Sequence, residues 1–417
     1  MFVQHPVVNK MKRKRYNYSK LFRDIYRFRG FKYNQIIIKD DVVHIFLTRT
    51  RKTATCRNCG RRNPIGLESY KRTIRDLDLG TKKCYITFFE EKLKCTCGYR
   101  GYEEINFSRP YSRCTTRFEE YVYLLCQKMT IKDVSEITHL NWKTIKDIDK
   151  YYINKQIESL KDISPRRIGV DEVAYDKGHK YLTIVRDLDP NAVIWVGRKR
   201  QKDTLDNFFK DIGKIKSNRI ELAVLDMWDP YIASIKEHCP NGEIVFDKFH
   251  VIKKVNEALD TIRRKEFADA TAREKLNMKR KRFIILKRNK NLNEKQLERL
   301  DELMKNNETL YKSYLLKEQI SDIFDEENHE EALKRLSEWI DNVRETGFEP
   351  FKKVVGTLRK YSYGIHNYFK YKVTNAGSEG INTKINVIRR KAYGYWDLDY
   401  FILKIFQACG VMKLDPP

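Results

Sequence analysis

The sequence lacks the run of roughly 18 uncharged apolar residues that a membrane-spanning helix needs. Hydrophobic runs such as Ala192–Val196 end after a few residues. The basic stretch Lys12–Arg15 is followed by no apolar segment, so a secretory signal peptide is not expected. Neither a Gly-x-Gly-x-x-Gly motif nor a phosphate-binding Gly-x-x-x-x-Gly-Lys-Ser/Thr motif is present. We therefore expect a cytoplasmic protein with no membrane partner and no nucleotide cofactor.

Acidic residues are few beside the basic ones. Asp and Glu number 57 against 84 Lys and Arg, which gives a formal net charge of +27. This excess indicates a polyanionic partner, with nucleic acid as the first candidate. The 25 Tyr, 21 Phe and 5 Trp exclude a disordered basic tail, and 417 residues suffice for two or three folded domains.

Cysteines are also few, and only two pairs of the nine lie close together, Cys56 with Cys59 and Cys95 with Cys97. In a reducing compartment such pairs favour a metal site over disulfides. Short β runs surround them, which predicts a β-rich module over residues 35–112 after a basic segment, residues 1–34. Four thiolates would form a closed structural zinc site, with Gly60 and Gly98 turning the chain after each pair. The alternatives are unligated thiols, or His44 or Cys84 in place of one ligand.

Residues 113–163 have apolar residues at helical spacing, which predicts three helices with a short turn at His139–Asn141. Thr130 and Asn141 are suitable N-caps for the second and third helices. This outline is typical of a helix-turn-helix, whose last helix can enter a major groove. An ordinary three-helix packing unit is the alternative. The candidate DNA contacts on the last helix are Trp142, Lys143, Thr144 and Lys146.

From residue 164 to 250 strands alternate with helices. Three consecutive β runs are followed by helix-linked runs at 220–226 and 243–246, which predicts a mixed sheet covered by helices. The order suggests a ribonuclease H-like core made of residues 164–250 and 373–410, interrupted by an all-α insertion over residues 251–372. Within the insertion we predict a basic helix for phosphate contacts, or else a solvated charged face. The helix is expected around Phe283–Leu286, with Lys287 and Arg288 after it. The candidate phosphate contacts before it are Lys279, Arg280, Lys281 and Arg282.

Asp171 and Asp226 each follow an apolar run and are expected at strand ends, on the rim of the sheet where ligand sites gather. A two-metal site for Mg²⁺ needs a third oxygen donor, and Glu379 in the first turn of a predicted helix is the best candidate. By spacing alone, these acids could equally be helix caps and solvated carboxylates. The same helix carries basic residues that could hold a DNA backbone, namely Lys384, Arg389, Arg390 and Lys391.

The order of these motifs resembles a DDE transposase of the ISL-three group of bacterial insertion sequences, from about Gln35 to Gly410. The resemblance rests on the two cysteine pairs, the helix-turn-helix outline and four segments: Ile168–Glu172, Leu225–Met227, Ile244–Ile252 and Thr374–Asn382. It implies that Asp171, Asp226 and Glu379 are the catalytic acids, binding Mg²⁺ or Mn²⁺. It also implies a zinc-binding N-terminal part and a helix-turn-helix that binds terminal inverted repeats.

Asp247 and His250 lie three residues apart at a predicted strand-to-helix junction. They could position a scissile phosphate or donate a proton to the leaving 3′ oxygen, a role that rests mostly on the resemblance. The alternative is that Asp247 only caps the helix.

The expected protein is therefore a Mg-dependent transposase that cuts and transfers DNA strands. Its partners would be double-stranded transposon ends and target DNA on the bacterial nucleoid, and it would act as a homodimer or larger assembly. The rival function is a non-catalytic regulator that binds DNA through the zinc module and the helix-turn-helix.

Overall fold

The computed structural model describes residues 28–410 except 51–53, 63 and 159–162. The chain divides into two compact units, one within residues 1–152 and the other within 153–413. The first unit therefore contains both the cysteine pairs and the predicted helix-turn-helix. Across the described residues, no helix combines the length and the apolar character that a membrane span requires.

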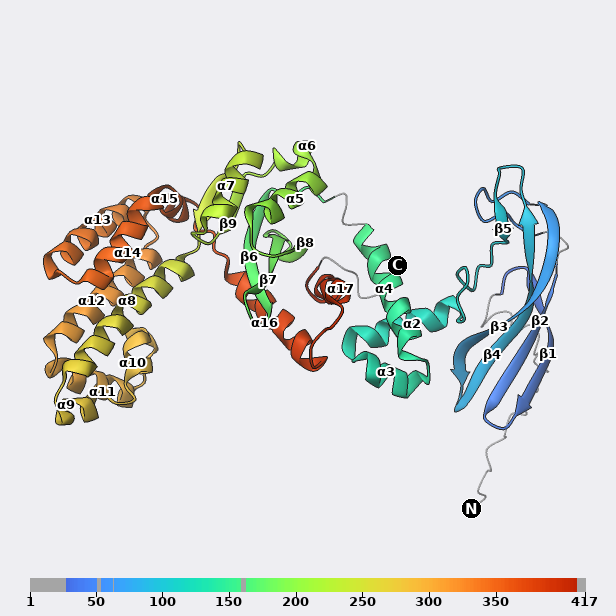
Figure 1. Ribbon diagram of the computed structural model, residues 1–417, viewed down its shortest axis with the longest axis horizontal. Helices are drawn as coiled ribbons and strands as arrows, with labels where there is room; N and C mark the ends of the chain where they lie inside the picture. The colour runs from blue at the N-terminus through green and yellow to red at the C-terminus, as the bar shows by residue number, and fades with distance from the viewer. Residues whose placement is uncertain (1–27, 51–53, 63, 159–162, 411–417) are drawn as a thin grey trace, which may run out of the picture. The chain divides into compact units, whose positions relative to one another are not determined.

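The first unit is built on a five-stranded sheet in the order β1-β2-β4-β3, with β5 paired to β4 (Figure 1). The alternation in β2 sends Val43, Ile45 and Leu47 into the core, as expected for a half-buried strand. The β1–β2 hairpin turns at Asp40–Asp41 as predicted. The strands are β1 (Phe31–Lys39), β2 (Val42–Arg49), β3 (Ile65–Leu79), β4 (Lys82–Lys94) and β5 (Arg100–Tyr102).

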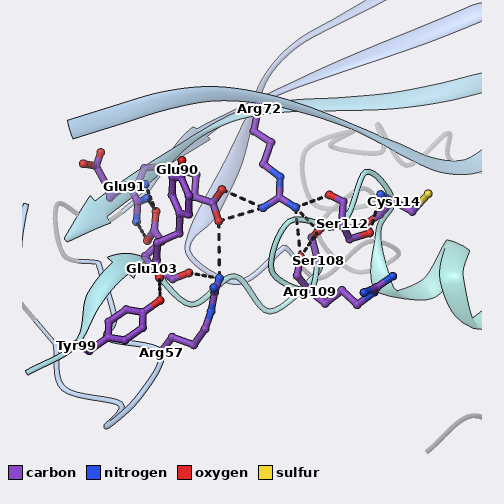
Figure 2. A network of polar contacts seen from close by, with 12 residues as sticks. Arg57, Arg72, Glu90, Glu91, Tyr99, Glu103, Ser108, Arg109, Ser112 and Cys114 are labelled. Atoms are coloured by element: carbon purple, nitrogen blue, oxygen red, sulfur yellow. Dashed lines mark hydrogen bonds and ion pairs between the residues drawn. The ribbon is translucent and has the colours of Figure 1, made fainter. Parts of the chain in front are cut away.

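A network of buried charges fastens the chain after β5 to this sheet (Figure 2). Arg72 of β3 donates to the Glu90 carboxylate and to the Ser108 hydroxyl. Farther along, Arg109 forms an ion pair with Glu119, which is buried in helix α2. Because a buried carboxylate is costly unless it is paired, these contacts fix the path from the sheet into the helices.

Three helices follow, α2 (Thr116–Lys128), α3 (Ile131–Thr138) and α4 (Trp142–Glu158). Thr130 forms a capping box with Asp133 at the start of α3. The Asn141 side chain accepts from the Lys143 N–H at the start of α4. Both predicted caps and the short turn between them are confirmed.

The second unit contains a five-stranded sheet in the order β10-β9-β6-β7-β8. β6, β7 and β8 are antiparallel neighbours, whereas β9 and β10 run parallel to β6, so the predicted mixed sheet is confirmed. The strands are β6 (Arg167–Asp176), β7 (Lys180–Asp187), β8 (Ala192–Arg198), β9 (Leu222–Leu225) and β10 (Glu243–Phe246); helices α5 (Lys202–Ile212), α6 (Lys214–Ser217) and α7 (Asp229–His238) lie between the later strands.

Two hydrophobic clusters involve this sheet. One joins the sheet and helices α5 and α7 to the helices of the insertion. The other packs β6, β7 and β8 against two C-terminal helices, α16 (Ala376–Lys391) and α17 (Leu398–Cys409). The second cluster buries Ile381 and Ile385 of α16, which holds this helix against the sheet.

The chain between β10 and α16 is helical, as predicted (Figure 1). The expected basic helix around Phe283–Leu286 is present but short, and most of the basic residues at 279–282 lie outside it. Lys279 and Arg280 lie in the turn before α10, Lys281 is 8% exposed and bonded to Asn277 and Glu302, and Arg282 opens α10. The helices are α8 (Lys248–Asp269), α9 (Ala272–Met278), α10 (Arg282–Leu286), the 3₁₀ turn η2 (Asn289–Asn291), α11 (Glu294–Lys305), α12 (Glu308–Asp325), α13 (His329–Thr346), α14 (Glu349–Lys360) and α15 (Ser362–Tyr371).

Candidate active site and metal centre

Asp171 and Asp226 are brought together by the register of two parallel strands. Gly169 of β6 pairs with Val224 of β9, so continuing two residues along each strand places Asp171 beside Asp226. Asp226 follows the end of β9 as predicted, but Asp171 does not end its strand. β6 continues to Asp176 because its other edge remains paired with β7 after β9 has ended. The pair of aspartates therefore lies at the end of β9 but in the middle of β6.

A third carboxylate, Glu172, lies in the same cluster. Carboxylate oxygens of Asp171, Glu172 and Asp226 are all within 4.8 Å of one another. Burial, and then the charge of Asp226, raises the pKa of Asp171 to about 6, and the same two causes raise the pKa of Glu172. Such crowding of buried acids favours a cation. Sequence reasoning missed Glu172 as a site residue, although its position directly after Asp171 was a usable signal.

Glu379 enters from a different element. It lies exposed in the first turn of α16 and lines a cavity of about 600 Å³ together with Asp171, Asp247 and His250. Asn382, one turn later on α16, donates to the Asp171 carboxylate at 2.8 Å. Glu379 and Asp171 thus line the same cavity. The acid that lies close to both Asp171 and Asp226, however, is Glu172.

His250 and Asp247 frame this cavity from the start of α8. The Asp247 carboxylate accepts from the Phe249 N–H at 3.1 Å, so the predicted cap is confirmed. His250 Nε2 forms an ion pair with Asp226 Oδ1. Although burial opposes a charged imidazole, Asp226 and its acidic neighbours raise the pKa of His250. The histidine is therefore held close to the second aspartate with its charged form favoured.

Asn375 joins the start of α16 to the sheet. Its side-chain oxygen accepts from Nε of Arg186 at 3.1 Å and from the Ser378 hydroxyl at 2.7 Å. Its backbone N–H donates to Asp247. Arg186 lies on β7 and is 2% exposed, so its guanidinium has lost its hydration. The hydrogen bond to Asn375 offsets part of that cost. This arrangement fixes the helix turn that carries Glu379.

Gly377 tests this packing. A Cβ atom at Gly377 would overlap with Arg186 Nη1 and Asn191 Oδ1, whereas one at Gly380 in the same helix would meet nothing within 4 Å. We expect Gly377→Ala to lower stability by about 1–3 kcal/mol, the usual cost of overpacking. The matched change Gly380→Ala is expected to be neutral or stabilising by up to about 1 kcal/mol. Thermal unfolding of both variants measures the difference, and equal melting temperatures would contradict a rigid Arg186 site.

The four predicted zinc ligands converge in the first unit. The Sγ atoms of Cys56 and Cys97 are 3.8 Å apart, and those of Cys59 and Cys95 are 3.7 Å apart. A tetrahedron with Zn–S bonds of 2.3 Å has edges of about 3.8 Å, so the spacing fits one zinc ion. Gly60 and Gly98 have φ of 69° and 88° and close the turns after each pair, as predicted. The Tyr99 N–H and the Asn58 amide lower the pKa of Cys97 to about 6, which favours the thiolate.

The predicted DNA-contacting residues differ in how far their side chains are exposed. On α4, Trp142 and Lys143 are exposed, with the lysine ammonium 5.6 Å from the indole centroid, while Thr144 and Lys146 are half-buried. On α16, Lys384, Arg390 and Lys391 are exposed, whereas Arg389 is half-buried and donates to the Ala174 carbonyl.

Comparison with known proteins identifies the family. A family model for ISL3 elements, described as "Transposase", matches residues 168–405, and a second, "Helix-turn-helix domain of transposase family ISL3", matches residues 103–153. The transposase for insertion sequence element IS1001 of Bordetella parapertussis is 30% identical over 370 residues, covering 87% of this chain and 91% of that protein. The transposase for IS1557 of Mycobacterium tuberculosis is 26% identical over 371 residues, covering 82% of each. The chain belongs to the ISL3 family of DDE transposases.

Proposed function

We propose that this transposase binds the terminal inverted repeats of its insertion sequence, hydrolyses a phosphodiester at their boundary and joins the freed 3′ hydroxyl to target DNA. Asp171, Asp226 and Glu379 are the proposed ligands of two Mg²⁺ or Mn²⁺ ions. The observation that carries the proposal is the strand register that places Asp171 beside Asp226, because Asp171 also lines a cavity together with Glu379.

The donor set suits a hard divalent cation. The ligands are carboxylate oxygens, and a cation between Asp171 and Asp226 would offset the repulsion that raises the pKa of Asp171. When bound, such ions supply the activated nucleophile and stabilise the leaving oxygen of an in-line displacement. The protein's own part is to hold the acids in register and to position the DNA strand.

Glu379 is the better third ligand than Glu172 because its carboxylate is uncommitted. Glu172 accepts from Arg200 at 2.6 Å, and that guanidinium also lies over the Trp228 ring, 4.3 Å from its centroid. Glu379 has no hydrogen bond or ion pair within the described residues. We therefore assign Glu172 to holding Arg200 and Glu379 to the metal.

His250 is the proposed proton donor to the leaving 3′ oxygen. It lines the cavity, and its pairing with Asp226 favours the protonated imidazole. Asp247 acts as a positioning residue, since it caps α8 just before the histidine and accepts from the Asn375 N–H at the start of α16.

Further parts of the proposal concern the rest of the chain. Three antiparallel strands followed by two parallel ones support a ribonuclease H-like core. The cysteine cluster supports one structural zinc ion, and exposed Trp142 and Lys143 support α4 as the helix that binds the terminal repeats. Because two transposon ends must be brought together, we propose that a dimer or larger assembly is the active form.

The test is cleavage of a labelled duplex carrying the element's terminal repeat, with Mg²⁺ or Mn²⁺, by wild type, Glu379→Gln and Glu172→Gln. We expect Glu379→Gln to bind the duplex normally and to lose detectable cutting at the repeat boundary. Glu172→Gln is expected to retain cutting within about tenfold, a cost near 1.4 kcal/mol. The reverse pattern would make Glu172 the third ligand. Metal-independent binding without cutting by wild type would instead favour a DNA-binding regulator.

A further inference from the structure

Three arginines converge on one buried aspartate in the insertion, away from the catalytic acids. Asp260 of α8 is 7% exposed, and its carboxylate oxygens lie 2.8 Å from Arg263 Nε, 3.4 Å from Arg264 Nε and 3.2 Å from Arg282 Nε. A single buried acid thus holds three guanidinium groups, and the cluster has a surplus of positive charge.

The contacts leave the outer ends of two arginines free. All three use Nε, and within the described residues the Nη atoms of Arg264 and Arg282 make no hydrogen bond. The side chains of Arg264 and Arg282 are 66% and 52% exposed. A guanidinium whose Nε is fixed presents its remaining N–H groups in a set direction, which suits the oxygens of a phosphate.

These arginines line an open cavity of about 490 Å³ along α8, together with Lys253. Four basic side chains border it against two acidic ones, of which Asp260 is already paired. Asn256 lines it too, with a buried side-chain oxygen that lacks a hydrogen-bond partner among the described residues. This oxygen can only accept a hydrogen bond, so a water molecule beside a bound phosphate could donate to it.

The cavity borders the catalytic one. Phe249 and Ile252 line both, so the two lie along the same helix. Asp260 comes ten residues after His250, which is about 15 Å along an α-helix. One strand of DNA rises about 3.4 Å per nucleotide, so this length corresponds to roughly four to five nucleotides.

We propose that Arg264 and Arg282, oriented by Asp260, form a phosphate clamp for the DNA backbone about four to five nucleotides from the scissile phosphate. The clamp rests on the proposed function in one respect, that cutting occurs in the cavity lined by Asp171 and Glu379. The clamp differs from the phosphate contacts predicted at 279–282, because it includes Arg264 of α8 and excludes Lys281, which is turned inward.

The test uses full-length protein carrying Glu379→Gln, so that DNA is bound without being cut. In this background, Arg264→Gln with Arg282→Gln is compared with Lys279→Gln with Arg280→Gln. Both pairs remove two positive charges, but the control residues are exposed in the α9–α10 turn. Affinity for the terminal-repeat duplex is measured over a salt series. We expect the clamp variant to lower the slope of log K against log salt by about 2, and the control to leave it unchanged.

Position is tested by replacing single phosphates of the duplex with neutral methylphosphonates. Protein with the clamp intact is expected to lose affinity at phosphates about four to five nucleotides from the cut, and the clamp variant to be insensitive there. Arg264→Lys with Arg282→Lys keeps the charge but lacks the Nε contact, and is expected to lose this position dependence. Equal losses in the clamp and control variants, or losses spread evenly over all phosphates, would overturn the clamp. Absence of cleavage in wild type would contradict the proposed function and with it the distance counted from the cut. The salt series is read without cutting, so it would still decide whether Arg264 and Arg282 bind the backbone.

Discussion

Asp171→Asn is expected to lower strand cleavage by roughly 10³-fold while making the protein more stable at pH 7.5. The loss follows because a bound cation stabilises transition-state charge by several kcal/mol, and about 4 kcal/mol corresponds to this factor. The gain follows because an ionised Asp171 is buried beside Asp226. Cleavage of the terminal-repeat duplex and thermal unfolding without added divalent cation measure the two effects.

The stability effect has a defined pH dependence. The pKa of Asp171 is about 6 in the folded protein and near 3.9 in an unfolded chain. Burial thus favours the neutral carboxyl, so its contribution to stability is present at low pH and is lost as pH rises through 6. Asparagine removes this cost, and the expected gain is roughly 2–3 kcal/mol at pH 7.5 and near zero at pH 4.

Asp229→Asn is the matched control. Asp229 is the first residue of α7, where its exposed carboxylate pairs with Lys360 and Tyr361. Its replacement removes the same charge, yet cleavage is expected to stay within about threefold of wild type, since an exposed ion pair contributes little. An Asp171→Asn variant that cuts at the wild-type rate would rule out Asp171 as a metal ligand.

Local signals in the sequence predicted much of the fold because they depend on neighbours along the chain. The caps at Thr130 and Asn141 and the turn at Asp40–Asp41 are settled by residues a few positions apart. The mixed sheet was also predictable, since strand lengths and the helices between them restrict the possible orders.

Other features depend on contacts between distant segments. The partner of Asn375 is Arg186, 189 residues earlier, and nothing near either residue indicates the pairing. Likewise, the apparent basic run at 279–282 is divided by tertiary contacts, which turn Lys281 toward Glu302 and Arg282 toward Asp260. The close approach of Glu172 to Asp226 follows from strand register, which the sequence alone does not fix.

Cys97→Ser is expected to abolish zinc binding and to destabilise the first unit by several kcal/mol. Structural zinc contributes apparent binding free energies of about 10–16 kcal/mol in small zinc domains, and three remaining thiolates retain only part of this. A loss of this size would lower the melting temperature of the first unit by more than about 10 °C. Metal analysis and calorimetry of the full chain measure both changes, and the transition of the second unit should not move.

Cys84→Ala is the control, because Cys84 was an alternative ligand in the sequence. It is buried in β4 opposite Val43 of β2, and it does not belong to the cluster of four cysteines. This variant is expected to keep about one zinc ion per chain and to lose only the packing of a small buried side chain, about 1 kcal/mol. Zinc retained by Cys97→Ser but lost by Cys84→Ala would place the ion elsewhere. The same comparison separates two roles of cysteine in this unit. Replacing Cys97 removes a zinc ligand, whereas replacing Cys84 removes only a buried side chain from the core.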